Sequence, residues 1–246
     1  VVPDAWGGAG MDYVSLAVVL EEIAAGDGAT STIVSVQNSV VCGPILAFGN
    51  DAQKEHYLKP LARGEWLGCF CLTEPHAGSD AGAITTRAVR RGDHYVLNGV
   101  KQFITTGKNA AVAVVFAVTD KAAGKKGISA FLVPTSTPGY VVARVEEKLG
   151  QRAADTAQIV CENCRVPAAN QLGSDSCAAA PWPPTGRRHG AGGIRRSPCL
   201  CARADELRQG ARRASGDQFQ ARRHGHPDRS GAPAHLARGG AAGRGP

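Results

Sequence analysis

The chain has 246 residues, of which 43% are hydrophobic, and a formal net charge of +7. This length allows one large domain or two smaller ones with a buried core. Residues 1–173 carry a net charge of −1 and residues 174–246 one of +8. The positive net charge of the whole chain therefore says nothing about a binding partner of residues 1–173. We find no signal peptide and no apolar run of about 20 residues, which predicts a cytoplasmic protein that does not enter membranes.

The first part of the chain is predicted to be helical. Helices are expected from Asp12 to Gly26, over residues 30–48 and over residues 51–61. Asp12 and Asn50 are typical N-caps, and Pro44 predicts a kink or break in the second helix. The apolar residues recur with a period near 3.6. Residues 1–64 are therefore predicted to be part of a helical domain.

From Trp66 the hydrophobic period changes to two, which is typical of β-strands. Strands are predicted over residues 66–73, 84–90, 94–100, 101–105, 111–118, 128–134, 140–148 and 158–165. Arg91-Gly92-Asp93 and Asn98-Gly99 are turn signals. The apolar run 111–118 predicts a strand buried on both faces. Seven or eight short strands with frequent turns predict a small β-sandwich or β-barrel.

The stretch Phe70–Asp80 begins as a strand, breaks at Glu74-Pro75 and continues as a loop of small residues. The proline favours extended geometry at Glu74 and removes one backbone donor. The backbone N–H groups of residues 77–79 can approach a ligand closely. Such a rim of hydroxyl and amide donors suits a polar or anionic cofactor, and an ordinary strand-to-loop turn is the alternative.

The eight cysteines are predicted to be reduced thiols, partly in the core. Cys161 and Cys164 have the spacing of half a zinc site, but residues 1–173 contain no second half at matching spacing. Cys69 and Cys71 are two residues apart, which places both side chains on one face of a strand. We therefore expect no metal site.

Six motifs, in order, resemble the acyl-CoA dehydrogenase family over about residues 2–173, and the short-chain members slightly more than the others. They are Phe70-Cys71-Leu72-Thr73-Glu74-Pro75-x-Ala77-Gly78-Ser79-Asp80, Leu97-Asn98-Gly99-x-Lys101-x-Phe103-Ile104-Thr105, the run 126–134, the run 148–152, the run 164–167 and Asn170-x-Leu172-Gly173. The resemblance implies an α+β multidomain protein in which residues 65–173 form an antiparallel β-barrel between helical domains. It also implies FAD-dependent α,β-dehydrogenation of an acyl-CoA, electron transfer to an electron-transfer flavoprotein, and a homotetramer.

The resemblance further implies which residues contact FAD. They are Phe70, Leu72, Thr73, Gly78, Ser79, Phe103, Ile104 and Thr105. Thr73 and Thr105 would hydrogen-bond the flavin ring, and such donors stabilise its reduced form. Phe103 would cover one face of the ring, with a place in the barrel core as the alternative. Ser79 would bind the thioester side of the acyl-CoA or the CoA phosphates.

The catalytic base of the family is a Glu in its C-terminal helical domain. This chain offers no counterpart for that residue, and Glu74 belongs to the loop motif and is not a candidate for the base. No catalytic residue is therefore predicted. A non-catalytic flavin or acyl-CoA binding module is the alternative function.

Residues 174–246 depart from the family, which continues with a four-helix bundle. They contain 13 Arg, with Pro- and Gly-rich runs and no apolar period, which predicts a disordered tail. A shifted reading frame after Gly173 would explain the change, because one permitted shifted translation of residues 206–242 gives an amphipathic helix that resembles the family. Since the chain begins with Val, we also expect it to be a fragment. Nucleic-acid binding by the basic tail is a third, less favoured function, because its aromatic residues are few.

Overall fold

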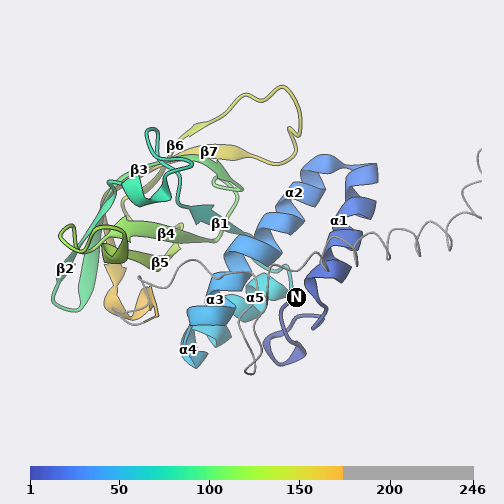
Figure 1. Ribbon diagram of the computed structural model, residues 1–246, viewed down its shortest axis with the longest axis horizontal. Helices are drawn as coiled ribbons and strands as arrows, with labels where there is room; N and C mark the ends of the chain where they lie inside the picture. The colour runs from blue at the N-terminus through green and yellow to red at the C-terminus, as the bar shows by residue number, and fades with distance from the viewer. Residues whose placement is uncertain (174–246) are drawn as a thin grey trace, which may run out of the picture. The chain divides into compact units, whose positions relative to one another are not determined.

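The computed structural model describes residues 1–173. The disordered tail and the shifted reading frame predicted for residues 174–246 lie outside the described residues. Helical segments come first (Figure 1): η1 (Asp4–Trp6), α1 (Tyr13–Gly26), α2 (Gly28–Val36), η2 (Gln37–Val41), α3 (Cys42–Phe48), α4 (Asp51–Gln53), η3 (Lys54–Leu58) and α5 (Lys59–Ala62). Strands and short 3₁₀ turns follow: β1 (Gly68–Cys71), η4 (Ala81–Ala83), β2 (Arg87–Arg91), β3 (His94–Thr105), β4 (Val112–Val118), η5 (Gly124–Gly127), β5 (Ile128–Pro134), β6 (Tyr140–Val145), β7 (Thr156–Pro167), η6 (Ala168–Asn170) and β8 (Gln171–Leu172).

The helix ends have the chemistry that the sequence predicts. The Asp12 side chain accepts a hydrogen bond from the Ser15 backbone N–H at 2.8 Å. Asn50 and Gln53 form a reciprocal capping box. The break that Pro44 could have caused does not occur, because the helix is continuous from Gly28 to Phe48. A π-helical turn, η2, lies just before Pro44, where proline cannot donate to the preceding turn and its ring crowds that turn.

Among the described residues, the continuous helix Gly28–Phe48 is long and apolar enough to cross a membrane by length and composition alone. The expectation that the chain has no apolar segment of this length is therefore wrong. Helices in protein cores pass the same test, and 28% of this apolar window is buried. Its residues Val41 and Ile45 are fully buried in one cluster with Val112 of the sheet.

The strands form one open sheet in the order β6-β7-β3-β2-β4-β5-β8, with β1 paired to β4. The predicted antiparallel β-barrel is wrong in two respects. The end strands β6 and β8 do not pair within the described residues, and β1 and β2 both run parallel to β4. Alternating hydrophobicity predicts where strands lie in the sequence, but it does not predict which strands pair or in which direction they run.

Strand β3 is continuous through Asn98-Gly99, so the turn predicted there is wrong. Gly99 packs against the segment before β2: a Cβ atom on Gly99 would lie 2.4 Å from Thr86 Oγ1. The glycine therefore allows a close approach of two segments instead of a chain reversal. Opposite Asn98, strand β7 contains one extra residue, in a bulge between Cys161 and Cys164.

Two apolar cores lie on opposite faces of the central strands. Alternate residues of β4 point into each core, as the prediction of a strand buried on both faces requires. Cys69 and Cys71 share one face of β1, as predicted, with sulfur atoms 3.7 Å apart. The opposite face of β1 meets the helices, where the Gln37 side chain accepts a hydrogen bond from the Gly68 N–H at 2.9 Å.

Candidate functional site

Strand β1 ends at Cys71, and the chain then enters a tight loop. The Glu74 N–H donates to the Ala77 carbonyl at 3.0 Å, and the Ala77 N–H donates back to the Glu74 carbonyl at 3.1 Å. This closed turn leaves Gly78 and Ser79 exposed just beyond it. The main chain of Thr73, in turn, is tied to β3, because its carbonyl accepts the Gln102 N–H at 2.8 Å.

Phe103 lies on a bulge of β3, where the pairing with β7 shifts between Lys101 and Ile104. Without that bulge, the strict alternation that buries Leu97 would also turn Phe103 into the core. The bulge instead leaves Phe103 63% exposed, with a φ of 57°. The alternative that Phe103 is a core residue is therefore wrong.

The structure brings most of the predicted site residues to one end of β1 and to the β3 bulge. We call six members of the predicted set, which are exposed or partly exposed, the rim: Leu72, Thr73, Gly78, Ser79, Phe103 and Thr105. The other two predicted residues have buried or inward-facing side chains. Ile104 is 2% exposed in one core, and Phe70 makes an edge-to-face contact with Phe116 at 5.0 Å between ring centroids. Ile104 could reach a ligand through its main chain only, whereas Phe70 is half-buried.

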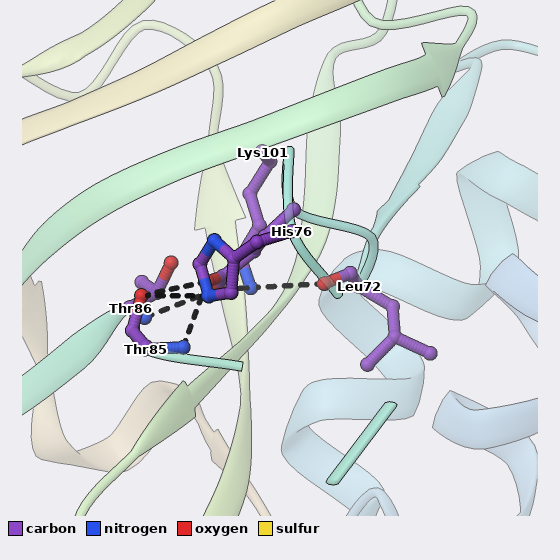
Figure 2. Close-up of polar contacts among 6 residues, drawn as sticks. Leu72, His76, Thr85, Thr86 and Lys101 are labelled. Atoms are coloured by element: carbon purple, nitrogen blue, oxygen red, sulfur yellow. Dashed lines mark hydrogen bonds and ion pairs between the residues drawn. The ribbon is translucent and has the colours of Figure 1, made fainter. Parts of the chain in front are cut away.

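A buried ion pair lies beneath the rim (Figure 2). Lys101 Nζ is 2.8 Å from Glu74 Oε1 and 3.1 Å from the Leu72 carbonyl oxygen. Both oxygens of the Glu74 carboxylate are also used by the segment before β2. Oε2 accepts the Thr85 N–H at 2.7 Å and the Thr85 hydroxyl at 2.9 Å, and Oε1 accepts the Thr86 N–H at 3.0 Å.

The environment keeps Glu74 ionised. Burial by itself would raise the pKa of its carboxyl group, but hydrogen bonds from Lys101, Thr86 and Thr85 and the charge of Lys101 outweigh burial and lower the pKa to about 2. Burial lowers the pKa of the Lys101 ammonium, and Glu74 partly offsets that effect. His76 is half exposed, with Nε2 3.7 Å from Glu74 Oε2.

A second polar group connects the β3 bulge to its neighbours. The Gln102 side chain donates to Glu146 at 2.7 Å and accepts from Gln158 at 2.6 Å. Glu146 also accepts from Arg144 at 2.7 Å. The residue before Phe103 is thus fixed from two sides, by β7 and by the loop after β6.

Sequence reasoning did not single out Lys101, although a signal for it exists. Tyr95 and Leu97 lie on the same side of this alternating strand as Lys101 and are core residues, which favours burial of Lys101. A buried lysine needs an anionic partner. The partner, Glu74, belongs to a motif that the sequence already marked, but no sequence pattern states that the two meet.

A cavity of about 890 Å³ adjoins this region without including the rim. It lies between β2 and the loop after β4, and Thr85 is the residue that it shares with the ion-pair network. Four cationic side chains line it: Arg87, Arg90, Lys121 and Lys126.

Comparisons with known proteins agree with the order of the motifs. Residues 1–65 match the acyl-CoA dehydrogenase N-terminal domain, and residues 69–164 match the acyl-CoA dehydrogenase middle domain. Over 172 residues the chain is 50% identical to the human mitochondrial short-chain specific acyl-CoA dehydrogenase, a match that covers 70% of this chain and 42% of that protein. The chain thus spans less than half the length of this relative.

Two solved structures of acyl-CoA dehydrogenases have a similar fold over the matched residues. The butyryl-CoA dehydrogenase of Megasphaera elsdenii is 40% identical with a TM-score of 0.69, and the match covers 71% of this chain and 47% of that chain. A glutaryl-CoA dehydrogenase of Mycobacterium smegmatis, solved in complex with FADH2, is 41% identical with a TM-score of 0.64. That second match covers 70% of this chain and 45% of the other.

Proposed function

Because the chain belongs to the acyl-CoA dehydrogenase family, whose N-terminal and middle domains it carries, we propose that the rim binds the flavin of an FAD-dependent acyl-CoA dehydrogenase. The observation that carries this proposal is the outward position of Phe103. Its side chain is 63% exposed on a left-handed bulge. Backbone strain of this kind clusters at ligand sites, and an exposed ring offers stacking area to a planar ligand.

The rim residues fit a flavin in their chemistry. Thr73 and Thr105 are only partly buried, so their hydroxyls can reach a ligand, and Ser79 is exposed. Phe103 would cover one face of the ring, and the two threonines would donate hydrogen bonds to its edge. When bound, FAD supplies the acceptor for a hydride from the substrate. The charges of Glu74 and Lys101 compensate each other beneath the rim.

The substrate class that we propose is a short-chain acyl-CoA. Support comes from the 50% identity to a short-chain specific relative and from the likeness to a butyryl-CoA dehydrogenase. Ser79 would contact the thioester side or the CoA phosphates. An electron-transfer flavoprotein as electron acceptor and a homotetramer as the assembly belong to the same proposal, and a cytoplasmic location stays a prediction.

For this chain we propose weak FAD retention and no turnover. The match covers 42% of the human relative, and the family's base belongs to the C-terminal helical domain, which lies beyond the matched residues. The same observation favours the second candidate, a non-catalytic flavin or acyl-CoA binding module. Nucleic-acid binding would depend on residues 174–246, outside the described part of the chain.

Two spectroscopic steps separate these candidates. Oxidised-flavin absorbance in the purified full chain would support either flavin function. Anaerobic addition of butyryl-CoA would bleach that absorbance only if the chain also removes the substrate proton and transfers the hydride. We expect a flavin spectrum after reconstitution with FAD and no bleaching. A chain whose titration with FAD gives no saturable change in flavin absorbance or fluorescence would contradict the proposal.

A further inference from the structure

Glu74 and Lys101 are the buried charged side chains of residues 1–173, at 3% and 0% exposure. Stability alone gives a poor account of such a pair. Two charges lose their hydration on burial, and replacing a buried ion pair with apolar residues of similar volume is often neutral or stabilising. The contacts of Glu74 and Lys101 with the rest of the chain therefore have to explain why the pair is buried.

The pair joins three segments of the chain at one point: residues 72–74, residues 85–86 and Lys101 on β3. Lys101, on β3, donates to the Leu72 carbonyl beyond β1 and to Glu74 in the loop. Glu74 in turn accepts both backbone N–H groups of the segment Thr85-Thr86, which leads into β2. In Figure 2 the Lys101 side chain, the Leu72 carbonyl oxygen and the Thr85-Thr86 segment meet at this point, whereas the Leu72 side chain points away from it. No apolar replacement could accept these N–H groups or satisfy the Leu72 carbonyl.

The same junction fixes the strained residue of the rim. Lys101 is anchored two residues before Phe103, and the Gln102 N–H is bonded to the Thr73 carbonyl. On the other side, Ile104 is 2% exposed in the core. A non-glycine residue keeps a φ of 57° only where its surroundings over-determine it. These contacts supply that constraint for Phe103.

We propose that Lys101 and Glu74 are positioning residues of the rim. The pair holds the β1 end and the β3 bulge in one arrangement, so that Thr73 and Phe103 meet a flavin ring without further ordering. Preorganisation of this kind raises affinity, because the free site loses less conformational freedom on binding. The ligand half of this inference rests on the proposed function, whereas the positioning half concerns the free chain alone.

The test uses four variants of the full chain: Lys101→Met, Glu74→Gln, the double variant K101M/E74Q, and Lys121→Met as the control for loss of an exposed lysine. Three quantities are measured for each variant. They are amide hydrogen exchange without ligand, the dissociation constant for FAD, and the thermal midpoint. E74Q keeps one carbonyl oxygen in place of the carboxylate, so it carries the same test if K101M does not fold.

We expect K101M to speed exchange of the Thr85, Thr86 and Gln102 amides at least tenfold, with β4 and β5 unchanged. The same variant should weaken FAD binding at least tenfold, and K121M should match the wild type in all three quantities. The double variant should recover part of the thermal midpoint lost in K101M, because no buried charge is left unpaired. Its FAD affinity should stay low.

Two results would overturn the inference. One is exchange at these amides within twofold of the wild type in K101M and in E74Q. The other is FAD affinity that follows the thermal midpoint across all variants, which would make the pair structural only. If the wild-type chain binds no FAD, the proposed function fails, and the exchange measurement still decides whether the pair positions the rim.

Discussion

Phe103 is exposed, although Gln102 and Ile104 on either side of it are buried. Its side chain therefore adds little to the core. We expect Phe103→Ala to change the free energy of unfolding by less than about 0.5 kcal/mol. The same change should weaken FAD binding by about 1–2 kcal/mol, roughly 5- to 30-fold, through the lost stacking area.

Fluorescence titration with FAD and urea unfolding measure the two effects of Phe103→Ala. Tyr13 on α1 is 62% exposed and lies outside the rim, so Tyr13→Ala is the matched control and should leave FAD affinity unchanged. Equal FAD affinity for F103A and the wild type would remove Phe103 from the site.

The single residue Glu74 is expected to make the free energy of unfolding depend on pH. Its folded-state pKa of about 2 lies below the ordinary value of 4.5. A lowered carboxyl pKa stabilises the fold above the unfolded-state pKa, and this contribution disappears as the pH falls from about 4.5 towards 2. It amounts to at most about 3 kcal/mol. Glu74→Gln should therefore destabilise the chain at pH 7, and by less at pH 3.

Urea unfolding of the wild type and E74Q at both pH values measures this difference. Glu55→Gln is the control, because Glu55 forms an exposed pair with Lys59 at 2.6 Å, and such pairs contribute less than about 1 kcal/mol. A destabilisation by E74Q that is equal at pH 7 and pH 3 would show that the charge of Glu74 has no part in it.

The residue types of the site were predictable from the sequence, but their mutual contacts were not. The motif around Thr73 and the aromatic at 103 marked two separate segments. What the pattern could not give is the bulge that turns Phe103 outward, because a bulge is set by the register with β7. The pairing of Lys101 with Glu74 could not be predicted either, because Glu74 lies 27 residues earlier in the chain and the contact depends on the fold.

At the scale of elements, β3 and the segment before β2 depend on a close approach at Gly99. A Cβ atom there would lie 2.4 Å from Thr86 Oγ1 and 2.7 Å from Thr86 Cα. The backbone contact cannot be relieved by a rotamer change, so Gly99→Ala should destabilise the chain by about 1–3 kcal/mol. Because Thr86 donates to Glu74, the rim should lose FAD affinity as well.

Gly43 is the control for this change, because it lies in α3 with no atom within 4 Å of a Cβ position. Gly43→Ala should stabilise the chain by about 0.5–1 kcal/mol. Urea unfolding of both variants measures the pair. A stability for G99A within about 0.5 kcal/mol of the wild type would mean that β3 and Thr86 move apart at little cost.

The buried side chain of Gln37 links the helical block to the sheet. Its amide group donates to the carbonyls of Leu61 and Trp66 at 2.9 Å each, and its oxygen accepts the Gly68 N–H at 2.9 Å. Gln37→Leu would leave buried backbone groups without partners, each of which costs about 1–3 kcal/mol. We expect a loss of more than about 2 kcal/mol in urea unfolding.

The matched control for Gln37 is its neighbour Asn38, which lies on the same helical turn. The Asn38 side chain donates to the Val34 carbonyl at 3.0 Å, a contact within its own helix. Asn38→Leu should therefore change stability by less than about 1 kcal/mol. Equal effects of the two substitutions would contradict the bridging role of Gln37.

The elements themselves were largely predictable, because caps and periodicity are local. Asp12 and Asn50 start helices where the sequence placed them. Two of the wrong predictions, the turn at Asn98-Gly99 and the barrel, concern contacts between distant segments. Glycine can serve a turn or a close approach, and only the position of Thr86 distinguishes the two uses.

At the scale of the whole molecule, the resemblance to the family ends near Gly173, and the Arg-, Gly- and Pro-rich composition of residues 174–246 begins there. If a shifted reading frame causes the change, resequencing of the coding region should reveal an insertion or deletion near codon 174. The corrected frame should encode amphipathic helices. A clean read that still encodes the Arg- and Gly-rich run would refute this explanation.

The central claim is that the rim formed by the β1 end and the β3 bulge binds a flavin. The most direct test is titration of the full wild-type chain with FAD, followed by flavin fluorescence and absorbance, with F103A measured in parallel. We expect saturable binding with a shifted flavin spectrum, and binding at least about fivefold weaker in F103A. Absence of saturable binding, or identical curves for the two chains, would contradict the account.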